Sequence, residues 1–355
     1  MAHFVTSSPT AKPNETVPCP QCGRPARSLD LITASLALPA VNSKEDILMS
    51  SLKCLSRALL ITVGACAAAT SVLAAQPAAL DTGRIEQITG LKGTYSKQED
   101  VFKVTKPRND VKVQVDDWTM PPFMGLTSYA AFKPAHGSQV MMMGDTVLFE
   151  DEVNPVMSAA LDAGLEVTAL HNHFFFDHPK VYFMHIGGTG DVAQLSEGVR
   201  KVYDKIGEIR SAHADPENIF PGHIASPSSI SPAPLEAVFG SKGQTNNGMF
   251  KVVIGKTASM HGATVGNEMG VNTWAAFAGT DDEAVVDGDF AMRESELQAV
   301  LKSMRASGIN IVAIHQHMTG ETPRVLFLHY WGKGKAVDLA KGVKAALDAQ
   351  SASTR

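Results

Sequence analysis

A long stretch of the chain occurs twice, 144 positions apart, and this repeat constrains the possible folds more than any other feature. The segment ALHNHFFFDHPKVYFMHIGGTGDVAQLSEGVRKV, which begins at Ala169, returns as AIHQHMTGETPRVLFLHYWGKGKAVDLAKGVKAA, which begins at Ala313. The match extends upstream to Gly144 and Gly288, each followed by an aspartate. Self-similarity at a fixed spacing indicates one structural unit used twice. The chain is therefore expected to build two related cores.

The repeat divides the chain into two tandem domains, which we expect at residues 85–207 and 235–349. Residues 208–234 lie between them and are rich in proline, serine and alanine, a composition typical of linkers. The chain has 355 residues, of which 44% are hydrophobic, so it is long and apolar enough for two cores.

The spacing of apolar residues predicts the elements of each copy. In the second copy it predicts strands at residues 250–256, 272–279, 283–292, 309–318 and 324–331. It predicts helices at residues 294–307 and 336–349, and in the first copy at residues 154–163 and 191–206. We therefore predict an α+β fold of two tandem homologous domains, each a mostly antiparallel sheet with two helices in the order ββ-βαββα.

The charge composition argues against nucleic acid as a partner. The chain has 31 basic and 36 acidic residues, a formal net charge of -5 and no basic stripe. Proteins that bind nucleic acid present a clustered positive surface. We expect no nucleic-acid partner.

Residues 49–75 have the features of a secretory signal peptide. Lys53 and Arg57 precede an uncharged stretch that begins at Ala58, and small residues follow near Ala75. An uncleaved membrane anchor is the alternative, because the uncharged stretch is nearly long enough to span a bilayer. Residues 1–48 would precede this signal, so we expect them to be a non-native or disordered extension.

One cysteine indicates a second kind of export signal. Val63 to Cys66 reads VGAC and is similar to a lipobox, whose lipidated cysteine would anchor the chain to a membrane without a spanning helix. No cysteine follows Cys66, so disulfides and thiolate metal sites are excluded from both repeats. We expect a periplasmic or extracellular protein that meets a membrane only through its signal or a lipid anchor.

Each copy contains three histidines that a β-hairpin would gather on one face. Side chains alternate across a strand, so His171 and His173 point the same way. If the chain turns at residues 177–179, His185 comes nearly opposite His171 and joins the same face. The same spacing gives an equivalent trio in the second copy, formed by His315, His317 and His329.

Three imidazoles on one patch predict a transition-metal site. Neutral imidazole is a favourable ligand for zinc and copper, and three protein ligands with an open fourth position are typical of catalytic zinc. The alternative is that the histidines are hydrogen-bonded polar groups of the sheet, present twice because the copies share an ancestor.

Glu152 and Glu296 stand at the start of the first helix of each copy, where two roles are open. A carboxylate interacts favourably with a helix N-terminus. The catalytic alternative makes each glutamate a ligand or general base beside the metal, as a hydrolytic site requires. Asp145 and Asp289 each follow a glycine and are expected in turns.

The segments HNHFFFDHPKVYFMHIGGTG and HQHMTGETPRVLFLHYWGKG, with the helix after each, resemble the repeated unit of the LppY/LpqO-type envelope lipoprotein family. The resemblance covers roughly residues 85–349. It implies an envelope location and a layout of two tandem copies of a domain of unknown function, and it supplies no catalytic residue.

Three functions follow from these features. The first is an exported envelope protein that binds a transition metal, most simply zinc or copper, through the histidine trio of each repeat. The second is a metal-dependent hydrolase that uses the same trio with a nearby glutamate. The third is a non-catalytic envelope protein that binds a partner or small molecule and whose histidines are structural. We favour the first.

Overall fold

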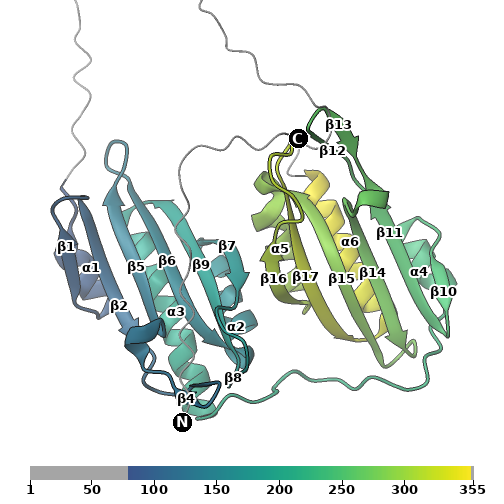
Figure 1. Cartoon of the computed structure of the whole chain (residues 1–355), viewed down its shortest axis with the longest axis horizontal. Helices are drawn as coiled ribbons and strands as arrows, with labels where there is room; N and C mark the ends of the chain where they lie inside the picture. Colours follow the sequence, from purple (N-terminus) through teal and green to yellow (C-terminus); the bar gives the residue numbers. More distant parts are fainter. Residues whose placement is uncertain (1–78, 353–355) are drawn as a thin grey trace, which may run out of the picture. The chain divides into compact units, whose positions relative to one another are not determined.

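The computed structural model describes residues 79–352 and shows two repeats with the same order of main elements (Figure 1). The predicted extension at residues 1–48 and the predicted signal peptide at residues 49–75, with Cys66, lie outside the described residues. The first repeat contains α1 (Thr82–Thr89), β1 (Gly93–Ser96), β2 (Val101–Pro107), β5 (Thr127–Pro134), β6 (Val140–Phe149), α2 (Glu150–Asp162), β7 (Glu166–His171), β9 (Val181–Gly190) and α3 (Val192–Ala212).

The second repeat contains α4 (Pro232–Phe239), β10 (Gln244–Asn246), β11 (Met249–Gly255), β14 (Asn272–Gly279), β15 (Ala284–Arg293), α5 (Leu297–Ala306), β16 (Asn310–His315), β17 (Val325–Gly334) and α6 (Ala336–Ala352). Smaller elements decorate the loops, namely β3 (Gln114–Val115), β4 (Trp118–Thr119), η1 (Pro122–Met124), β8 (Asp177–His178), β12 (Ala258–Met260), β13 (Ala263–Val265), η2 (Asn267–Met269) and η3 (Glu294–Glu296).

A mixed fold with a large antiparallel sheet agrees with the predicted class, but each repeat has elements that the predicted order lacks. Helices α1 and α4 open the repeats, and the short strands β1 and β10 follow them. Each helix has only eight residues, which is too short for an apolar period to stand out. The ends of α1 are set by local contacts instead, because Asp81 caps its first turn and Gly90 ends it in a left-handed conformation.

Each repeat contributes six neighbouring strands to the sheet, and each strand is antiparallel to the next. The order is β1-β2-β5-β6-β9-β7 in the first repeat and β16-β17-β15-β14-β11-β10 in the second. The helices pack on one face of this sheet and form the main hydrophobic core with alternate strand residues (Figure 1). On β6, for example, Met142 and Leu148 are fully buried in that core, whereas Met143 is 62% exposed.

Within residues 79–352, the other face of each sheet carries no α-helix and is covered only at one end (Figure 1). Small apolar clusters cover that end, built around Phe149 and Phe183 in the first repeat and around Val271 and Phe327 in the second. We call the uncovered part the open face. It is defined by two rows of cross-strand partners, Tyr129, Asp145 and His185 in the first repeat and Trp274, Asp289 and His329 in the second.

Strands β7 and β16 join the two repeats. They are neighbours in the strand order and pair antiparallel at Leu170 and Ile314, both of which belong to the main core. Each strand has a β-bulge, after Val167 in β7 and after Ile311 in β16. A bulge disturbs the ladder and leaves backbone groups that need another partner.

A side-chain amide from each repeat bonds to the bulge of the other. Asn154 in α2 donates Nδ2–H to the carbonyl of Ile311 at 3.0 Å and accepts its N–H at 2.7 Å. Gln298 in α5 donates to the carbonyl of Val167 at 2.9 Å and accepts its N–H at 3.0 Å. Because Gln298 and Ile311 lie 144 positions after Asn154 and Val167, the junction is a two-fold interface within one chain.

Among residues 79–352, the structure contains no helix that is both long and apolar enough to cross a membrane.

The junction amides can be tested by truncation. We expect Asn154→Ala and Gln298→Ala each to lower the free energy of unfolding by about 1–3 kcal/mol, because each leaves a backbone N–H and C=O without a partner. Urea unfolding followed by circular dichroism measures the effect. Gln244→Ala, an exposed amide on β10, is the control. Unfolding free energies equal to that of the control would show that the amides do not hold the junction.

Candidate metal centre

The two hairpins bring all six predicted histidines to the open face, but with a register that differs from the prediction. His171 pairs with Phe183, and His185 pairs with Ala169. The predicted position of His185, nearly opposite His171, is therefore two residues off, because β7 ends at His171 and a long connection precedes β9. A shift by two keeps both side chains on the same face, so the histidines still gather.

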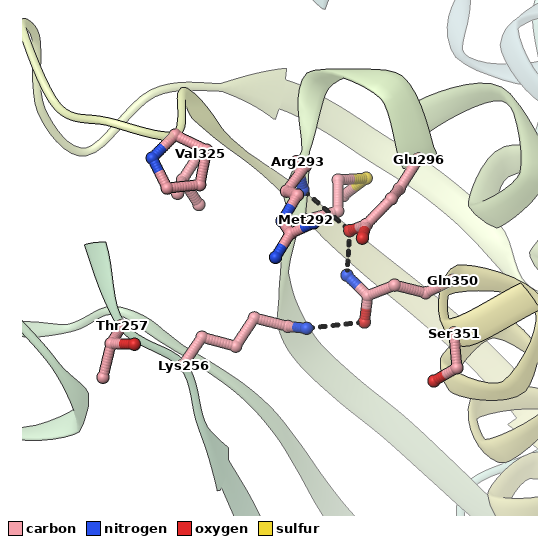
Figure 2. A pocket seen from close by; sticks show the side chains of 9 residues that line it. Lys256, Thr257, Met292, Arg293, Glu296, Val325, Gln350 and Ser351 are labelled. Atoms are coloured by element: carbon pink, nitrogen blue, oxygen red, sulfur yellow. Dashed lines mark hydrogen bonds between the residues drawn. The ribbon is translucent and has the colours of Figure 1, made fainter. Parts of the chain in front are cut away.

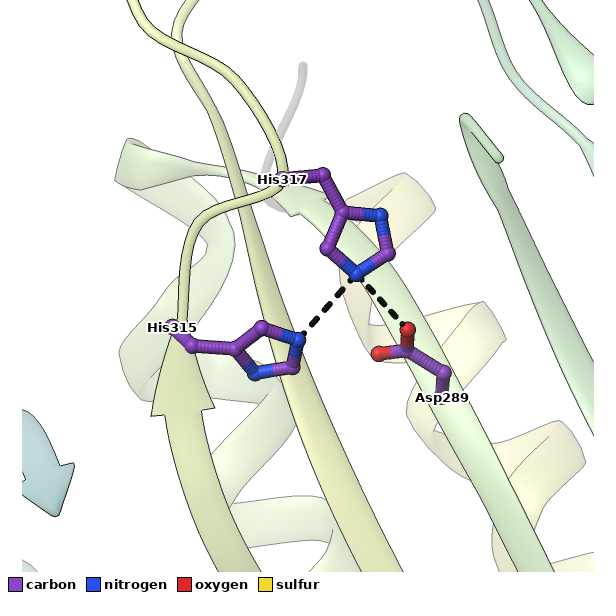
Figure 3. Close-up of side chains that lie close together, drawn as sticks. All are labelled: Asp289, His315 and His317. Atoms are coloured by element: carbon purple, nitrogen blue, oxygen red, sulfur yellow. Dashed lines mark hydrogen bonds and ion pairs between the residues drawn. The ribbon is translucent and has the colours of Figure 1, made fainter. Parts of the chain in front are cut away.

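The tightest cluster is in the second repeat, where Asp289 of β15 joins two histidines at the end of β16 (Figure 3). His317 Nε2 lies 3.0 Å from Asp289 Oδ2 and 3.1 Å from His315 Nε2. The ligand atoms of these three residues all lie within 4.8 Å of one another, so the group could hold a metal ion. His329 adjoins them, with its ring centroid 4.5 Å from that of His315.

Backbone carbonyls orient two of these rings. His317 Nδ1 is 3.2 Å from the carbonyl oxygen of Gly270, and His329 Nδ1 is 3.3 Å from that of Gly288. A carbonyl oxygen only accepts, so each contact is a hydrogen bond when the ring carries its hydrogen on Nδ1, and a neutral ring in that form keeps a lone pair on Nε2. The same outer contact fixes the tautomer of histidines that bind metals.

In that tautomer of His317, acceptor atoms converge at the centre of the cluster. With its hydrogen on Nδ1, the neutral His317 ring cannot donate to Asp289 Oδ2, although the two atoms are 3.0 Å apart. His315 Nδ1 and Asp289 Oδ1 are also buried and have no hydrogen-bond partner. A group of this kind needs a cation or an added proton among its acceptors.

Burial favours the neutral, metal-binding form of two of the imidazoles. Burial lowers the pKa of His315 to about 4, and the neighbouring His329 and His317 act in the same direction. Burial also lowers the pKa of His173, with a contribution from His171. Both rings are neutral at pH 7. Burial raises the pKa of Asp289, and the adjacent histidines oppose that shift.

Asp145 and Asp289 lie inside strands β6 and β15, so their expected place in turns is wrong. The preceding glycine suggested a turn, but Gly288 has another cause. A Cβ atom there would lie 2.2 Å from the Tyr330 ring and 2.4 Å from the carbonyl oxygen of Trp274. Glycine is needed for this close packing across the sheet. The repetition of Gly-Asp in both copies, set in an alternating strand, was the feature that could have revealed the aspartates.

The first repeat gathers the same residue types less compactly. His171 Nε2 and His185 Nε2 are 3.0 Å apart, and the centroid of the His173 ring is 5.1 Å from that of His171. Asp145 is the cross-strand partner of His185, and its Oδ1 has no hydrogen-bond partner. In the part of the chain that the structure describes, only the second repeat brings three such ligand atoms within 4.8 Å.

Glu152 lies in a buried network of charges at the start of α2. Its carboxylate accepts hydrogen bonds from Arg108 Nη1 and Nη2, both at 2.8 Å, and from the backbone N–H of Phe149 at 2.9 Å. Arg210 Nε is 2.9 Å from the same carboxylate, which is fully buried. These contacts match the helix-terminus role and engage both carboxylate oxygens.

Glu296 has an equivalent place at the start of α5, beside a pocket of about 270 Å³ (Figure 2). Its carboxylate accepts from the backbone N–H of Arg293 at 2.8 Å and from Gln350 Nε2 at 2.6 Å. Lys256 donates to the other end of the Gln350 amide at 2.7 Å. The catalytic role of Glu152 and Glu296 stays a prediction, and their contacts support a structural one.

Replacing Glu152 separates the two roles. We expect Glu152→Gln to lower the free energy of unfolding by about 1–3 kcal/mol, because the buried Arg108 and Arg210 would each lose a charged hydrogen-bond acceptor. Each arginine keeps one other carboxylate, Asp110 for Arg108 and Asp151 for Arg210. Bound metal per folded chain should be unchanged. Chemical unfolding and elemental analysis measure the two quantities, with the exposed neighbour Glu150→Gln as control. A variant that folds but binds less metal would support a role for Glu152 in the metal site.

The family model of a domain of unknown function, DUF1529 (DUF1259), matches the chain twice, at residues 83–205 and 233–349. This confirms the internal repeat, while the narrower resemblance to the LppY/LpqO-type family stays a prediction. No curated protein matches the chain.

Some solved structures match as well. The trimeric bacterial microcompartment shell protein PduB is 12% identical with a TM-score of 0.20, over 72% of this chain and 89% of its own. The double-ringed trimeric shell protein MSM0271 from the RMM microcompartment is 11% identical with a TM-score of 0.18, over 62% and 85%. EtuB from Clostridium kluyveri is 9% identical with a TM-score of 0.18, over 73% and 90%. TM-scores this low carry no argument about the chain.

Proposed function

Because the chain belongs to the DUF1529 (DUF1259) family and carries two copies of its domain of unknown function, we propose a function from the site itself: binding of one transition-metal ion by the histidine cluster of each repeat. The proposed ligands are His171, His173 and His185 in the first repeat and His315, His317 and His329 in the second. Asp145 and Asp289 extend the two sets.

One observation carries the proposal. His317 Nε2 lies close to both Asp289 Oδ2 and His315 Nε2, while its Nδ1 is 3.2 Å from the carbonyl oxygen of Gly270. A divalent cation would accept a lone pair from each of these three atoms at once and remove the repulsion between them. Carbonyl-bound Nδ1 with Nε2 turned to a common point is also how metal-binding histidines are oriented.

The donor set favours zinc or copper. Imidazole suits both ions, and three imidazoles with one carboxylate provide no thiolate or cluster of oxygens that would favour a softer or harder metal. Such a site suits a carrier, buffer or sensor of metal ions. Export to the periplasm or the outside of the cell is part of the proposal and rests on the signal-like residues 49–75 and the lipobox-like Cys66 alone.

The hydrolase remains a second prediction without a supporting contact. Hydrolysis at a metal needs a carboxylate that can take a proton from the bound water. Glu152 is bonded to two arginines, and the carboxylate beside the histidines is that of Asp289. Binding without catalysis is therefore the function that we favour.

Metal content tests the proposal directly. We expect the purified full chain, loaded with zinc and dialysed, to hold two ions by elemental analysis. The paired variant His171→Ala/His173→Ala and the paired variant His315→Ala/His317→Ala should each hold one, because each loses two ligands of one cluster. The control is His136→Ala/His261→Ala, which removes two exposed histidines outside the clusters. Equal zinc in all four proteins would refute metal binding by the trios.

Asp289 can be tested separately as a ligand. Asp289→Asn should weaken zinc binding at the second cluster by at least roughly 10–100-fold, the effect of losing even an indirect metal partner. The matched control is Asp287→Asn, two residues earlier on the same face of β15 and exposed. Competition with a chromophoric chelator gives both affinities. If the two variants bind zinc equally, Asp289 is not a ligand.

A further inference from the structure

The register of the junction places the two clusters next to each other on one face. Leu170 pairs antiparallel with Ile314, so in that register His171 lies across from Ala313 and His315 lies across from Ala169. On the far side, Ala169 pairs with His185 and Ala313 pairs with His329. A histidine of each cluster thus flanks each alanine.

Nothing large on the sheet separates the clusters. His185 and His315 are two strand spacings apart, or about 10 Å, and the same holds for His171 and His329. Of the strand residues that the structure describes, Ala169 and Ala313 stand between them on this face, each with a single methyl group. Both alanines are partly exposed, so the gap between the clusters is open to solvent.

With a metal ion in each, the two clusters carry a net positive charge that favours an anionic ligand. A divalent ion with three neutral imidazoles and one carboxylate carries a net charge of about +1, so two filled clusters present about +2 on one face. Lysines add to this on the outer side of each row, where Lys103 Nζ is 3.8 Å from the Tyr129 ring centroid and Lys251 Nζ is 4.1 Å from the Trp274 ring centroid.

We propose that the two clusters act as one paired-ion site for a ligand that carries two anionic groups, one for each ion. This inference rests on the proposed metal binding and adds the geometry and the ligand class. A linear dicarboxylate would span the gap, because a carboxylate oxygen binds a metal at about 2 Å and the facing histidines of the two clusters lie on strands about 10 Å apart. Binding one end raises the local concentration of the other, so a dianion gains affinity over a single carboxylate.

The spacing of the ions is measured with copper. The full chain loaded with two Cu²⁺ ions should show dipolar broadening in its frozen EPR spectrum, because the coupling rises steeply as two spins approach. The single-cluster variants His171→Ala/His173→Ala and His315→Ala/His317→Ala should each bind one Cu²⁺ and give narrow spectra. A two-copper spectrum equal to the sum of the two single-cluster spectra would overturn the paired site while leaving metal binding intact. If no copper binds, the proposed function fails and the paired site fails with it.

The ligand class is measured by calorimetry on the zinc-loaded chain. Adipate should bind at least tenfold more tightly than hexanoate, which has the same chain length and one carboxylate. That advantage should disappear in His315→Ala/His317→Ala, which keeps one cluster. Equal affinities for the two acids in the fully loaded chain would exclude a bridging dianion. If adipate still binds more tightly than hexanoate in the variant, protein side chains hold its second carboxylate. That result would also overturn the proposal.

Discussion

Side-chain alternation across a sheet with one covered face is the constraint on which the rest of the structure depends. Each strand sends successive side chains to opposite faces, and the helices cover only one of these. Met142 and Leu148 fill the covered side of β6, so Asp145 between them is directed to the open face. A slip of one residue would turn the imidazoles into an apolar core, where unpaired polar groups are costly.

That constraint explains how much of the site could be predicted from the sequence. The place of His185 beside His171 could be predicted although the expected register was two residues out, because only the parity of the strand decides the face. The places of Asp145 and Asp289 in strands could not be predicted, because glycine before aspartate usually marks a turn. Here the packing of Tyr330 against Gly288 requires the glycine, and this contact involves residues far apart in the chain. Helices α1 and α4 could not be predicted, because eight residues are too few to show a helical spacing of apolar residues. The buried arginines around Glu152 meet it only in the folded chain.

A proton could take the place of a cation in the second cluster, and the hydrogen-bond geometry separates the two cases. Protonating His317 would satisfy Asp289 Oδ2, and the pair would then resemble an ordinary ion pair. The single Nε2–H can point to only one acceptor, so His315 Nε2 would still face it without a bond, and His315 Nδ1 would still have no partner. A second proton would place like charges on rings whose centroids are 5.0 Å apart. A divalent ion avoids both costs because it accepts several lone pairs at once.

The duplication gives these clusters a fixed relation that separate subunits would not. Alone, either repeat would expose β7 or β16 as an edge strand with unpaired backbone groups. Pairing the two edges and closing both bulges with Asn154 and Gln298 removes that liability within one chain. A symmetric homodimer could form the same contacts, but its two clusters would have to be identical. Because the copies are fused, their sequences can diverge, and they have done so. The second cluster is compact and held by the Gly270 carbonyl, whereas the first is looser and is followed in the chain by Phe175 and Phe176, both more than four-fifths exposed. Two clusters of unequal character across one junction are what a fused pair permits and a homodimer does not.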